Sequence, residues 1–325
     1  MGLEARRVYR STSDDTIGGL DLVVVGAASR DLAGGDSRGW RLGGAATYCS
    51  LTAARLGMRV GCLLGLDPEA VERAGDELEM LASAGVAVSI VNLGSGPVFE
   101  NIERDGHRRQ RWLSASDRIP VAALPDEWRG TAAWLLVPVA GEVGPEWAGI
   151  PAAGAAVGIG WQGLLRELAP GGRVERIAPA RSPLLAAAGL VVASVDDVDS
   201  RTRIEALRPL APRAAIVLTA GASGGMALGA TGLVRYRALR ADEIVDPTGA
   251  GDVFLAALMT AWLLTGDVAT PATLGFAAAA GSCAVEGLGL AGVPTRTQVV
   301  DRLRAAGHSL SHAGGARRHD PRGRP

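Results

Sequence analysis

The segment DPTGAGD, residues 246–252, places a carboxylate where a glycine turn becomes a helix. Gly249 and Gly251 precede Asp252 closely, and the apolar run VFLAALMTAWLL follows. A helix start carries unpaired N–H groups and the positive end of the helix dipole, so it attracts anions, and glycines let an anion approach the backbone. Aspartate is also a common helix cap. The segment alone therefore leaves an anion site and a plain cap both open.

A second candidate carboxylate, Asp31, follows the first expected strand, where ligand-binding residues of open α/β sheets collect. A carboxylate at this place accepts hydrogen bonds from two vicinal hydroxyls, which predicts contact with a polyhydroxylated substrate. A solvated loop aspartate is the alternative. Gly43 and Gly44 open the next expected helix and would let substrate hydroxyls reach the backbone, although a plain N-terminal turn would look the same.

These residues belong to a chain of 325 residues in which short β-branched runs alternate with longer segments of helical period. Helices are expected at 43–57, at 68–85 and after the DPTGAGD turn. Strands are expected at 20–27, 59–65, 87–93, 134–139, 155–160, 189–194 and 214–221, with a hairpin over 224–230 and 232–239. The alternation predicts an α/β fold with a mostly parallel sheet covered by helices on both faces.

Two polar, extended stretches, 28–42 and 96–113, break this alternation, and the second carries a DGHR turn. They predict a strand-built lid at one edge of the sheet. Because Val98, Phe99 and Trp112 would be apolar on a thin ribbon, we expect the lid to close over substrate and to form a homodimer contact. Residues 1–19 and 307–325 are expected to be disordered, which leaves 20–306 as one domain.

Composition limits the partners and the compartment. The formal net charge is −1, from 33 basic and 34 acidic residues, so neither nucleic acid nor an anionic membrane is expected as a partner. The three cysteines form no CxxC pair, which favours free thiols over disulfides or structural zinc. The N-terminus has no apolar signal core, and the expected location is the cytoplasm.

Several motifs in this order resemble those of the ribokinase-like (PfkB-type) small-molecule kinases, over about residues 20–300. They are VVVGAASRDL at 23–32, GGAATYCSLTAARLG at 43–57, GCLLGLD at 61–67, TAGASGG at 219–225 and DPTGAGDVF at 246–254. The resemblance implies a three-layer α/β/α sandwich with a small β-strand lid. It also implies ATP-dependent phosphoryl transfer to an alcohol.

The resemblance implies a role for each motif. The backbone N–H groups of Gly249, Ala250 and Gly251 would form an anion hole for the γ-phosphate, and Asp252 would take the hydroxyl proton. The acceptor would be bound by Asp31, Gly43, Gly44 and Thr47, and the nucleotide by Thr219, Gly221 and Gly224. Asp246 resembles the family's monovalent-cation ligand, for K⁺, with a turn-forming aspartate as the alternative.

Two positions depart from the family pattern. Tyr48 stands where the family usually has asparagine, and the family's Asn-x-x-Glu appears as Ser194 and Asp197. Asp197 is expected to hold Mg²⁺ partly through water, which tolerates the shorter side chain. The segment GWQGLLR at 160–166 resembles the branch that contains cyclitol (myo-inositol-type) kinases. Gln162 and Arg166 are therefore expected to bind substrate, with helix-surface residues as the alternative.

The sequence thus predicts an ATP-dependent kinase that uses Mg²⁺ and K⁺ and acts on a small sugar or cyclitol. An uncharged polyhydroxylated ring is the expected acceptor, with a cyclitol ahead of a furanose sugar or a nucleoside. Two alternatives remain open. One is a catalytically weak sugar- or nucleotide-binding sensor, motivated by Tyr48 and Ser194, and the other is a nucleoside kinase.

Overall fold

A computed structural model describes residues 8–9, 19–104, 107–169 and 171–307. The expected disorder of the two ends therefore falls almost entirely outside the described residues, as does the centre of the DGHR turn. Within the N-terminal stretch, β1 (Val8–Tyr9) is described, and it pairs antiparallel with the edge of the main sheet.

The main sheet has ten strands, and its central seven are parallel. Strands β15 and β16 close one edge as an antiparallel hairpin and β1 closes the other. From edge to edge, the order is β1, β6 (Ala87–Asn92), β5 (Val60–Leu66), β2 (Leu22–Ala27), β9 (Ala133–Leu136), β10 (Ala156–Gly160), β13 (Leu190–Ser194), β14 (Ala215–Thr219), β15 (Gly225–Gly229) and β16 (Gly232–Tyr236). The predicted mostly parallel sheet is confirmed.

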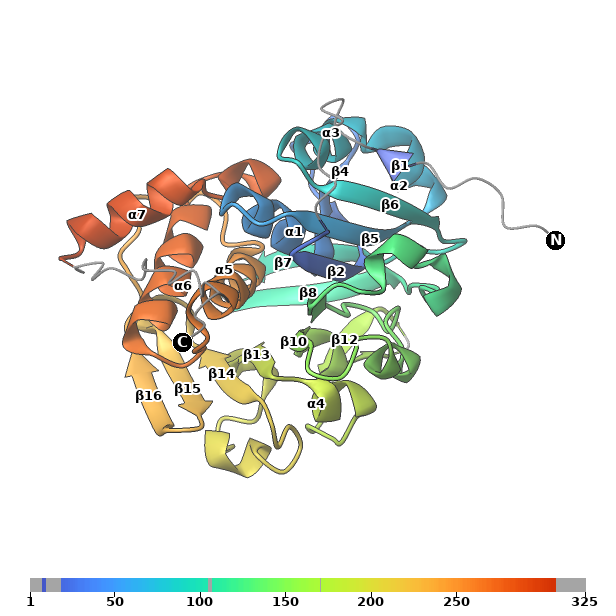
Figure 1. Cartoon of the computed structure of the whole chain (residues 1–325). Helices are drawn as coiled ribbons and strands as arrows, with labels where there is room; N and C mark the ends of the chain where they lie inside the picture. Colours follow the sequence, from blue (N-terminus) through green and yellow to red (C-terminus); the bar gives the residue numbers. More distant parts are fainter. Residues whose placement is uncertain (1–7, 10–18, 105–106, 170, 308–325) are drawn as a thin grey trace, which may run out of the picture.

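Successive residues of the central strands belong to two separate cores, one on each face of the sheet. Leu22 and Val24 join the first core, and Val23 and Val25 join the second. Since both faces are buried, these strands read as continuous apolar runs without polar alternation. The three-layer arrangement expected from the sequence follows from this division, and Figure 1 shows α1, α5 and α6 packed together on one side of the sheet.

The two outer layers are built differently. The first consists of α1 (Ala45–Arg55), α2 (Pro68–Arg73), α3 (Gly75–Ser83), α5 (Ala250–Thr265), α6 (Pro271–Ala284) and α7 (Arg296–Ala305). The second has only the short α4 (Pro183–Ala187) and several 3-10 turns, filled by Trp134, Trp147 and Trp161. The helix expected at 68–85 is broken at Ala74 into α2 and α3.

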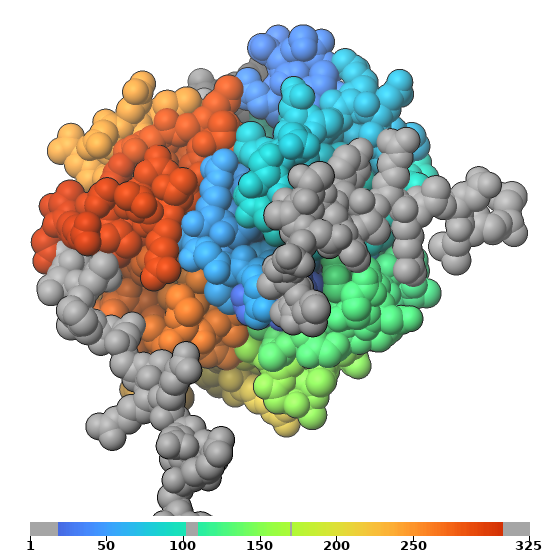
Figure 2. Space-filling model, turned by 45° about the horizontal axis from the view of Figure 1, so that its top comes forward, coloured from blue at the N-terminus to red at the C-terminus, as the bar shows by residue number. Residues whose placement is uncertain are grey.

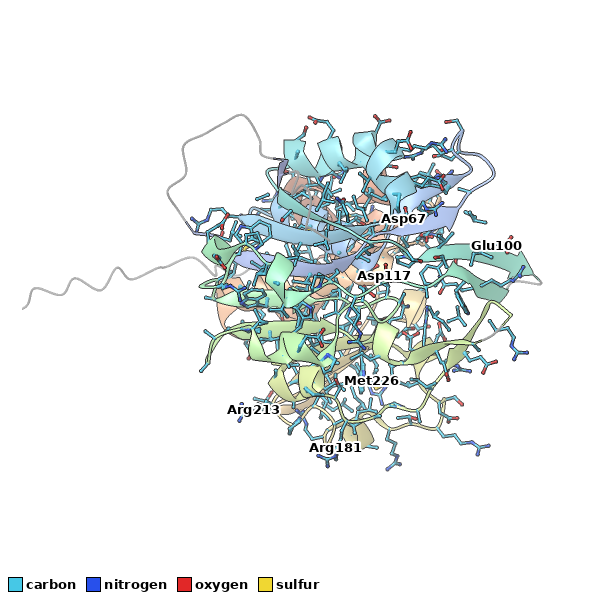
Figure 3. All side chains as sticks on the ribbon, turned by 90° about the vertical axis from the view of Figure 1, so that its right-hand side faces the viewer. Asp67, Glu100, Asp117, Arg181, Arg213 and Met226 are labelled. Carbon is cyan, nitrogen blue, oxygen red and sulfur yellow. The ribbon has the colours of Figure 1, made fainter. Side chains whose placement is uncertain are left out.

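A second sheet of six strands forms the lid, in the order β11, β12, β8, β7, β3, β4. The two expected stretches supply β3 (Ser29–Leu32), β4 (Trp40–Gly43), β7 (Val98–Arg104) and β8 (His107–Ser114). An additional hairpin, β11 (Arg166–Ala169) and β12 (Arg173–Arg176), was not predicted. In Figure 3, Glu100 of β7 lies on the part of the lid that projects from the body.

The side chains expected to be exposed on the lid are mostly covered. Val98 and Phe99 are each only 6% exposed, and the Trp112 indole donates a hydrogen bond to the Ala169 carbonyl at 2.8 Å. Among the lid side chains whose exposure the structure describes, the large apolar ones that are exposed are Leu32 and Leu113. The hairpin β11–β12 thus covers part of the β7–β8 ribbon, whose apolar side chains were expected to be exposed.

Distant parts of the chain meet around the start of α5. The Cys49 thiol on α1 donates to the Asp252 carbonyl at 3.4 Å, and the Arg55 guanidinium donates to the Val293 carbonyl. Figure 2 shows the corresponding blue and orange-red surfaces side by side. Across the described segments, no helix combines the length and the apolar character needed to cross a membrane.

Candidate active site

A cavity of about 1370 Å³ lies where β10, β13 and β14 end, at the N-terminus of α5 and beneath the lid. This is the edge of a parallel sheet where ligands of open α/β folds bind. The cavity brings together most of the residues that the sequence singled out. They are Asp31, Gly44, Tyr48, Gln162, Arg166, Ser194, Asp197, Thr219, Gly221, Gly224, Gly249, Ala250, Gly251 and Asp252.

The glycine turn before α5 is closely packed on one side and open on the other. Gly249 caps the helix in the left-handed conformation, with φ of 78°, and a Cβ there would collide with the Tyr48 ring. A Cβ on Gly251 would meet nothing within 4 Å. The first turn of α5 therefore faces open space at Gly251, as an anion site at a helix start requires, while the Ala250 amide donates a long hydrogen bond to the Pro247 carbonyl at 3.4 Å.

Asp252 lies in the first turn of α5 and is half-buried. Loss of hydration at this depth raises its pKa to about 7. The negative charges of Asp31 and Asp197 act in the same direction, while the positive charge of Arg166 opposes them. A carboxyl group with a pKa near neutrality can both accept and release a proton at physiological pH.

The second carboxylate, Asp31, is held by the elements around it. The Ser29 hydroxyl donates to its Oδ1 at 2.9 Å, and its Oδ2 lies over Gly43, where a Cβ would collide with it. Thr47 stands behind this turn, because its fully buried hydroxyl donates to the carbonyls of Gly43 and Gly44 at 3.0 and 2.7 Å. Thr47 thus shapes the paired-glycine turn from behind.

An ion-pair network fixes the strands that carry Asp31. The Arg30 guanidinium donates to Asp67 Oδ2 at 2.8 Å and to Glu69, and it lies over the Trp40 ring. The Trp40 indole donates to Glu69 Oε1 at 2.8 Å. Since Asp67 and Glu69 belong to the start of α2, the network ties β3 and β4 to the helical layer. In Figure 3, Asp67 lies close to the root of the lid.

Asp197 occupies the opposite part of the cavity, in the 3-10 turn η5 (Val195–Asp197) after β13. It is only 2% exposed. Its Oδ1 accepts hydrogen bonds from Arg166 at 2.7 and 3.1 Å, and its Oδ2 accepts one from the Ser194 amide at 3.1 Å. Arg166 also donates to Gln110 Oε1 of the lid at 2.9 Å, so it bridges the lid and η5.

Arg166 and Gln162 do not lie on a helix surface of the kind considered in the sequence. Arg166 begins β11, and Gln162 lies in the short 3-10 turn η4 (Gln162–Leu164), exposed at the cavity wall.

The far end of the cavity is flanked by glycines and lined with apolar groups. Gly221 and Gly224, after β14, have φ of 51° and 89°. The Tyr236 ring stacks on Phe254 with centroids 5.4 Å apart, and Ile244 is 70% exposed beside them. A glycine turn next to an apolar wall suits a ligand with a phosphate end and a planar base.

Asp246 holds the turn before α5 in place. Its Oδ1 accepts a hydrogen bond from the Thr248 amide at 2.9 Å, and its Oδ2 accepts one from the Gly289 amide at 3.2 Å. The turn-forming role considered for this aspartate is therefore present. In the described ranges, no cluster of three or more histidine, cysteine or acidic side chains could hold a metal ion without help from a ligand.

Sequence reasoning missed Glu142, a fully buried carboxylate beside the site. It accepts hydrogen bonds from the backbone amides of Ala27, Val139 and Ala140 at 2.8 to 3.2 Å, and burial raises its pKa. It thereby joins the ends of β2 and β9. The signal was an acidic residue shortly after a buried strand, the same signal that identified Asp31.

Comparisons with known proteins identify similar sequences and folds. Residues 189–296 match the model of the pfkB family carbohydrate kinases. No curated protein sequence matches the chain.

Among solved structures, a fructokinase from Xylella fastidiosa with bound ATP has a TM-score of 0.69 and 21% identity, covering 88% of this chain and 99% of its own. A pyrophosphate-dependent kinase of the ribokinase family, complexed with a pyrophosphate analogue and myo-inositol, has a TM-score of 0.68 and 17% identity, with coverages of 86% and 99%. A Methanocaldococcus jannaschii nucleoside kinase has a TM-score of 0.63 and 18% identity, with coverages of 89% and 100%.

These similarities confirm the fold that the motifs predicted. They span nearly the whole length of each compared structure, and the family match covers the segment that contains Asp197, the glycine loop after β14 and the DPTGAGD turn. The chain has the ribokinase-like fold, and its segment 189–296 is similar to the pfkB family carbohydrate kinases.

Proposed function

We propose that this protein is an ATP-dependent kinase that transfers the γ-phosphate to a hydroxyl of a small sugar or cyclitol. One observation carries the proposal. Asp252, with a pKa near 7, lies at the open N-terminus of α5, in the same cavity as Asp31 and the glycine loop after β14. The cavity therefore offers a base and an anion site between a candidate acceptor site and a candidate nucleotide site.

The reaction follows from this arrangement. The acceptor oxygen forms a bond to the γ-phosphorus while the bond from that phosphorus to the bridging oxygen of ADP breaks. Asp252 takes the hydroxyl proton, and the amides of Gly249, Ala250 and Gly251 stabilise charge on the phosphoryl oxygens. Because the open space at Gly251 lies on the cavity side, the phosphoryl group can approach these amides closely.

Magnesium fits the donor site through water. Asp197 already accepts three hydrogen bonds, which leaves capacity on its two oxygens for one bound water but little room for a direct metal bond. Bound magnesium supplies charge neutralisation for the donor phosphates. Asp246 and neighbouring carbonyls are the proposed site for K⁺, which would keep the turn before α5 in its anion-binding shape.

The proposed acceptor is an uncharged ring with vicinal hydroxyls, with a cyclitol ahead of a furanose or a nucleoside. Asp31 would accept hydrogen bonds from two hydroxyls, and Gln162 lies at the same cavity. A phosphate on the acceptor would need free cationic side chains, but Arg30 and Arg38 are engaged by carboxylates of α2, α3 and a nearby loop, and Arg111, which lines the cavity, is paired with Glu100. Binding of myo-inositol by a structural neighbour supports this choice.

A panel of acceptors with MgATP, scored by ADP release, tests the proposal. The panel contains myo-inositol, ribose, fructose, fructose 6-phosphate and adenosine. Turnover with a neutral polyol supports the proposal, and the highest kcat/KM is expected for myo-inositol. ATP binding without turnover on any acceptor would favour a sensor, and a preference for adenosine would favour a nucleoside kinase.

The expected homodimer and the cytoplasmic location remain predictions. Leu32 and Leu113 on the lid are 39% and 49% exposed, which gives the lid an apolar surface for a second copy of the chain. Sedimentation at several protein concentrations measures this directly, and a strict monomer would remove the dimer.

A further inference from the structure

The unpredicted hairpin β11–β12 places two arginines directly opposite each other at the cavity. In the antiparallel register, Arg166 pairs with Arg176, and Leu168 pairs with Val174. Paired residues of neighbouring strands project to the same face. All four line the cavity, and Arg166 contacts Asp197 and Gln110 there. Like charges directly opposite each other destabilise a strand pair unless an anion lies between or beside them.

The hydrogen-bond partners of these two arginines neutralise only one of the two positive charges. Arg166 is paired with Asp197 at 2.7 Å. Arg176 donates to the backbone carbonyls of Asp196 and Val198, both at 3.2 Å, and these partners are neutral. The pair together with Asp197 therefore carries a net charge of about +1, in a cavity that is also lined by four further carboxylates, those of Asp31, Glu175, Asp196 and Asp252.

The place of the hairpin in the sheet order indicates which anion would bind. Asp31 follows β2 on one side, and Thr219 ends β14 on the other. The hairpin follows β10 and is anchored to η5 after β13, so its arginines lie between these two positions. In an in-line transfer, the group between acceptor and nucleotide is the phosphate that moves.

We propose that Arg166 and Arg176 form a binding site for the terminal phosphate of the donor, with Asp197 and Gln110 as positioning residues for Arg166. This proposal rests on the proposed kinase function. Arg176 is the sharper test of the two, because removal of Arg166 would leave the buried Asp197 carboxylate without its partner.

Calorimetric binding of the non-hydrolysable ATP analogue AMP-PNP and of ADP, both with magnesium, tests the site without turnover. Arg176→Ala is expected to weaken AMP-PNP about tenfold, as for loss of one charge-assisted hydrogen bond, and to leave ADP unchanged. Arg166→Lys, which keeps the charge but loses the two-pronged contact with Asp197, is expected to weaken AMP-PNP as well.

Arg173→Ala is the matched control. Arg173 belongs to the same hairpin and also lines the cavity, but it pairs in register with Ala169 and its side chain is 73% exposed. Unlike Arg176, it has its charge neutralised by a carboxylate, that of Glu175 at 3.0 Å. It removes the same charge from the same element, and AMP-PNP binding is expected to stay near wild type. Equal effects of the Arg173 and Arg176 substitutions would overturn the proposal, because they would indicate a general charge effect.

Two further outcomes would contradict the proposal that Arg166 and Arg176 bind the terminal phosphate of the donor. Equal weakening of ADP and AMP-PNP would place the pair on the inner phosphates. A loss confined to fructose 6-phosphate, with fructose and AMP-PNP unaffected, would assign the pair to a phosphate on the acceptor. Because binding is measured without an acceptor, absence of turnover in the acceptor panel would defeat the kinase function and leave this test intact.

Discussion

The two ends of the cavity differ in how closely atoms pack around their glycines. At the acceptor end, backbone and side chains meet so closely that Gly43 has no room for a Cβ beside Asp31, and Arg30 ties the strand to α2. At the donor end, a Cβ on Gly221 would meet nothing within 4 Å, although one on Gly224 would collide with the Tyr236 carbonyl. A Cβ on Gly251, between the two ends, would also meet nothing within 4 Å. The acceptor end is thus fixed by packing, while Gly221 and Gly251 keep space open. Substitutions should therefore damage structure at the packed positions and binding at the two open glycines.

The largest effect is expected at Asp252, which lies between the two ends. Asp252→Asn keeps the shape and the helix-capping capacity but removes the base, so kcat should fall at least about 100-fold. Binding at both ends should stay close to wild type. Steady-state kinetics with the preferred acceptor, and calorimetry with AMP-PNP, measure these two quantities. An Asn variant with most of its activity would show that Asp252 is only a cap.

The next prediction contrasts two glycines of one turn. Gly249→Ala should lower Tm by several degrees, because its φ of 78° costs an L-residue about 1–2 kcal/mol and its Cβ would collide with Tyr48. Gly251→Ala should leave Tm unchanged or raise it, since alanine is favoured over glycine inside a helix by about 0.5–1 kcal/mol.

The same two glycine variants distinguish an effect on folding from an effect on binding. Gly251→Ala should weaken AMP-PNP and lower kcat in a fully folded protein, because the new methyl group occupies the space proposed for the phosphoryl group. Thermal unfolding and calorimetry on the two variants give both values. Normal nucleotide binding by the Gly251 variant would contradict the anion hole.

Much of the candidate site could be predicted from the sequence. The rest could not, because it depends on contacts between residues that are far apart in the chain. Three features are local signals: the order of the motifs along the chain, the paired glycines and the DPTGAGD turn. They can be recognised because turns and helix starts depend on residues close in sequence. The partners of Asp197 and Asp246 are non-local, and only the fold brings Arg166 and Gly289 to them.

The hairpin β11–β12 shows the limit of local patterns. Its sequence, RELAPGGRVER, contains a Gly-Gly turn between short polar runs and could have been recognised as a hairpin. Its charged residues are typical of an exposed segment. Nothing in the local sequence shows that Arg166 and Arg176 face a cavity. The second outer layer, with 3-10 turns in place of long helices, likewise depends on tryptophan packing across the sheet.

A smaller effect is expected at Asp31. Asp31→Asn keeps the size but replaces one acceptor oxygen by a donor, so kcat/KM for the acceptor should fall about tenfold, in line with one hydrogen bond to a charged group. The KM for ATP should stay the same, because Asp31 lies at the other end of the cavity. A matched rise in the KM for ATP would show that the two ends are not separate. The comparison requires only initial rates at varied acceptor and varied ATP.

A separate effect concerns stability and not activity. Because the folded protein raises the pKa of Asp252 from its ordinary value to about 7, the ionised carboxylate opposes folding, and stability from this group is lost as pH rises through 7. Asp252→Asn should therefore have a higher Tm than wild type at pH 8, and the difference should shrink toward pH 4. Thermal unfolding across this range measures the difference, and a constant offset would contradict the shifted pKa.

The pH dependence of kcat/KM tests the central claim, that Asp252 accepts the proton during phosphoryl transfer. With a pKa of about 7 in the free protein, the group is protonated and inactive below neutrality and ionised above it. Because kcat/KM reports the ionisation of the free enzyme, the account predicts that kcat/KM rises as one proton is lost near pH 7 and reaches a plateau above it. In Asp252→Asn, this step should be absent from the residual activity. A wild-type kcat/KM that stays level from pH 5.5 to 8.5, or an unchanged step in the variant, would contradict the claim.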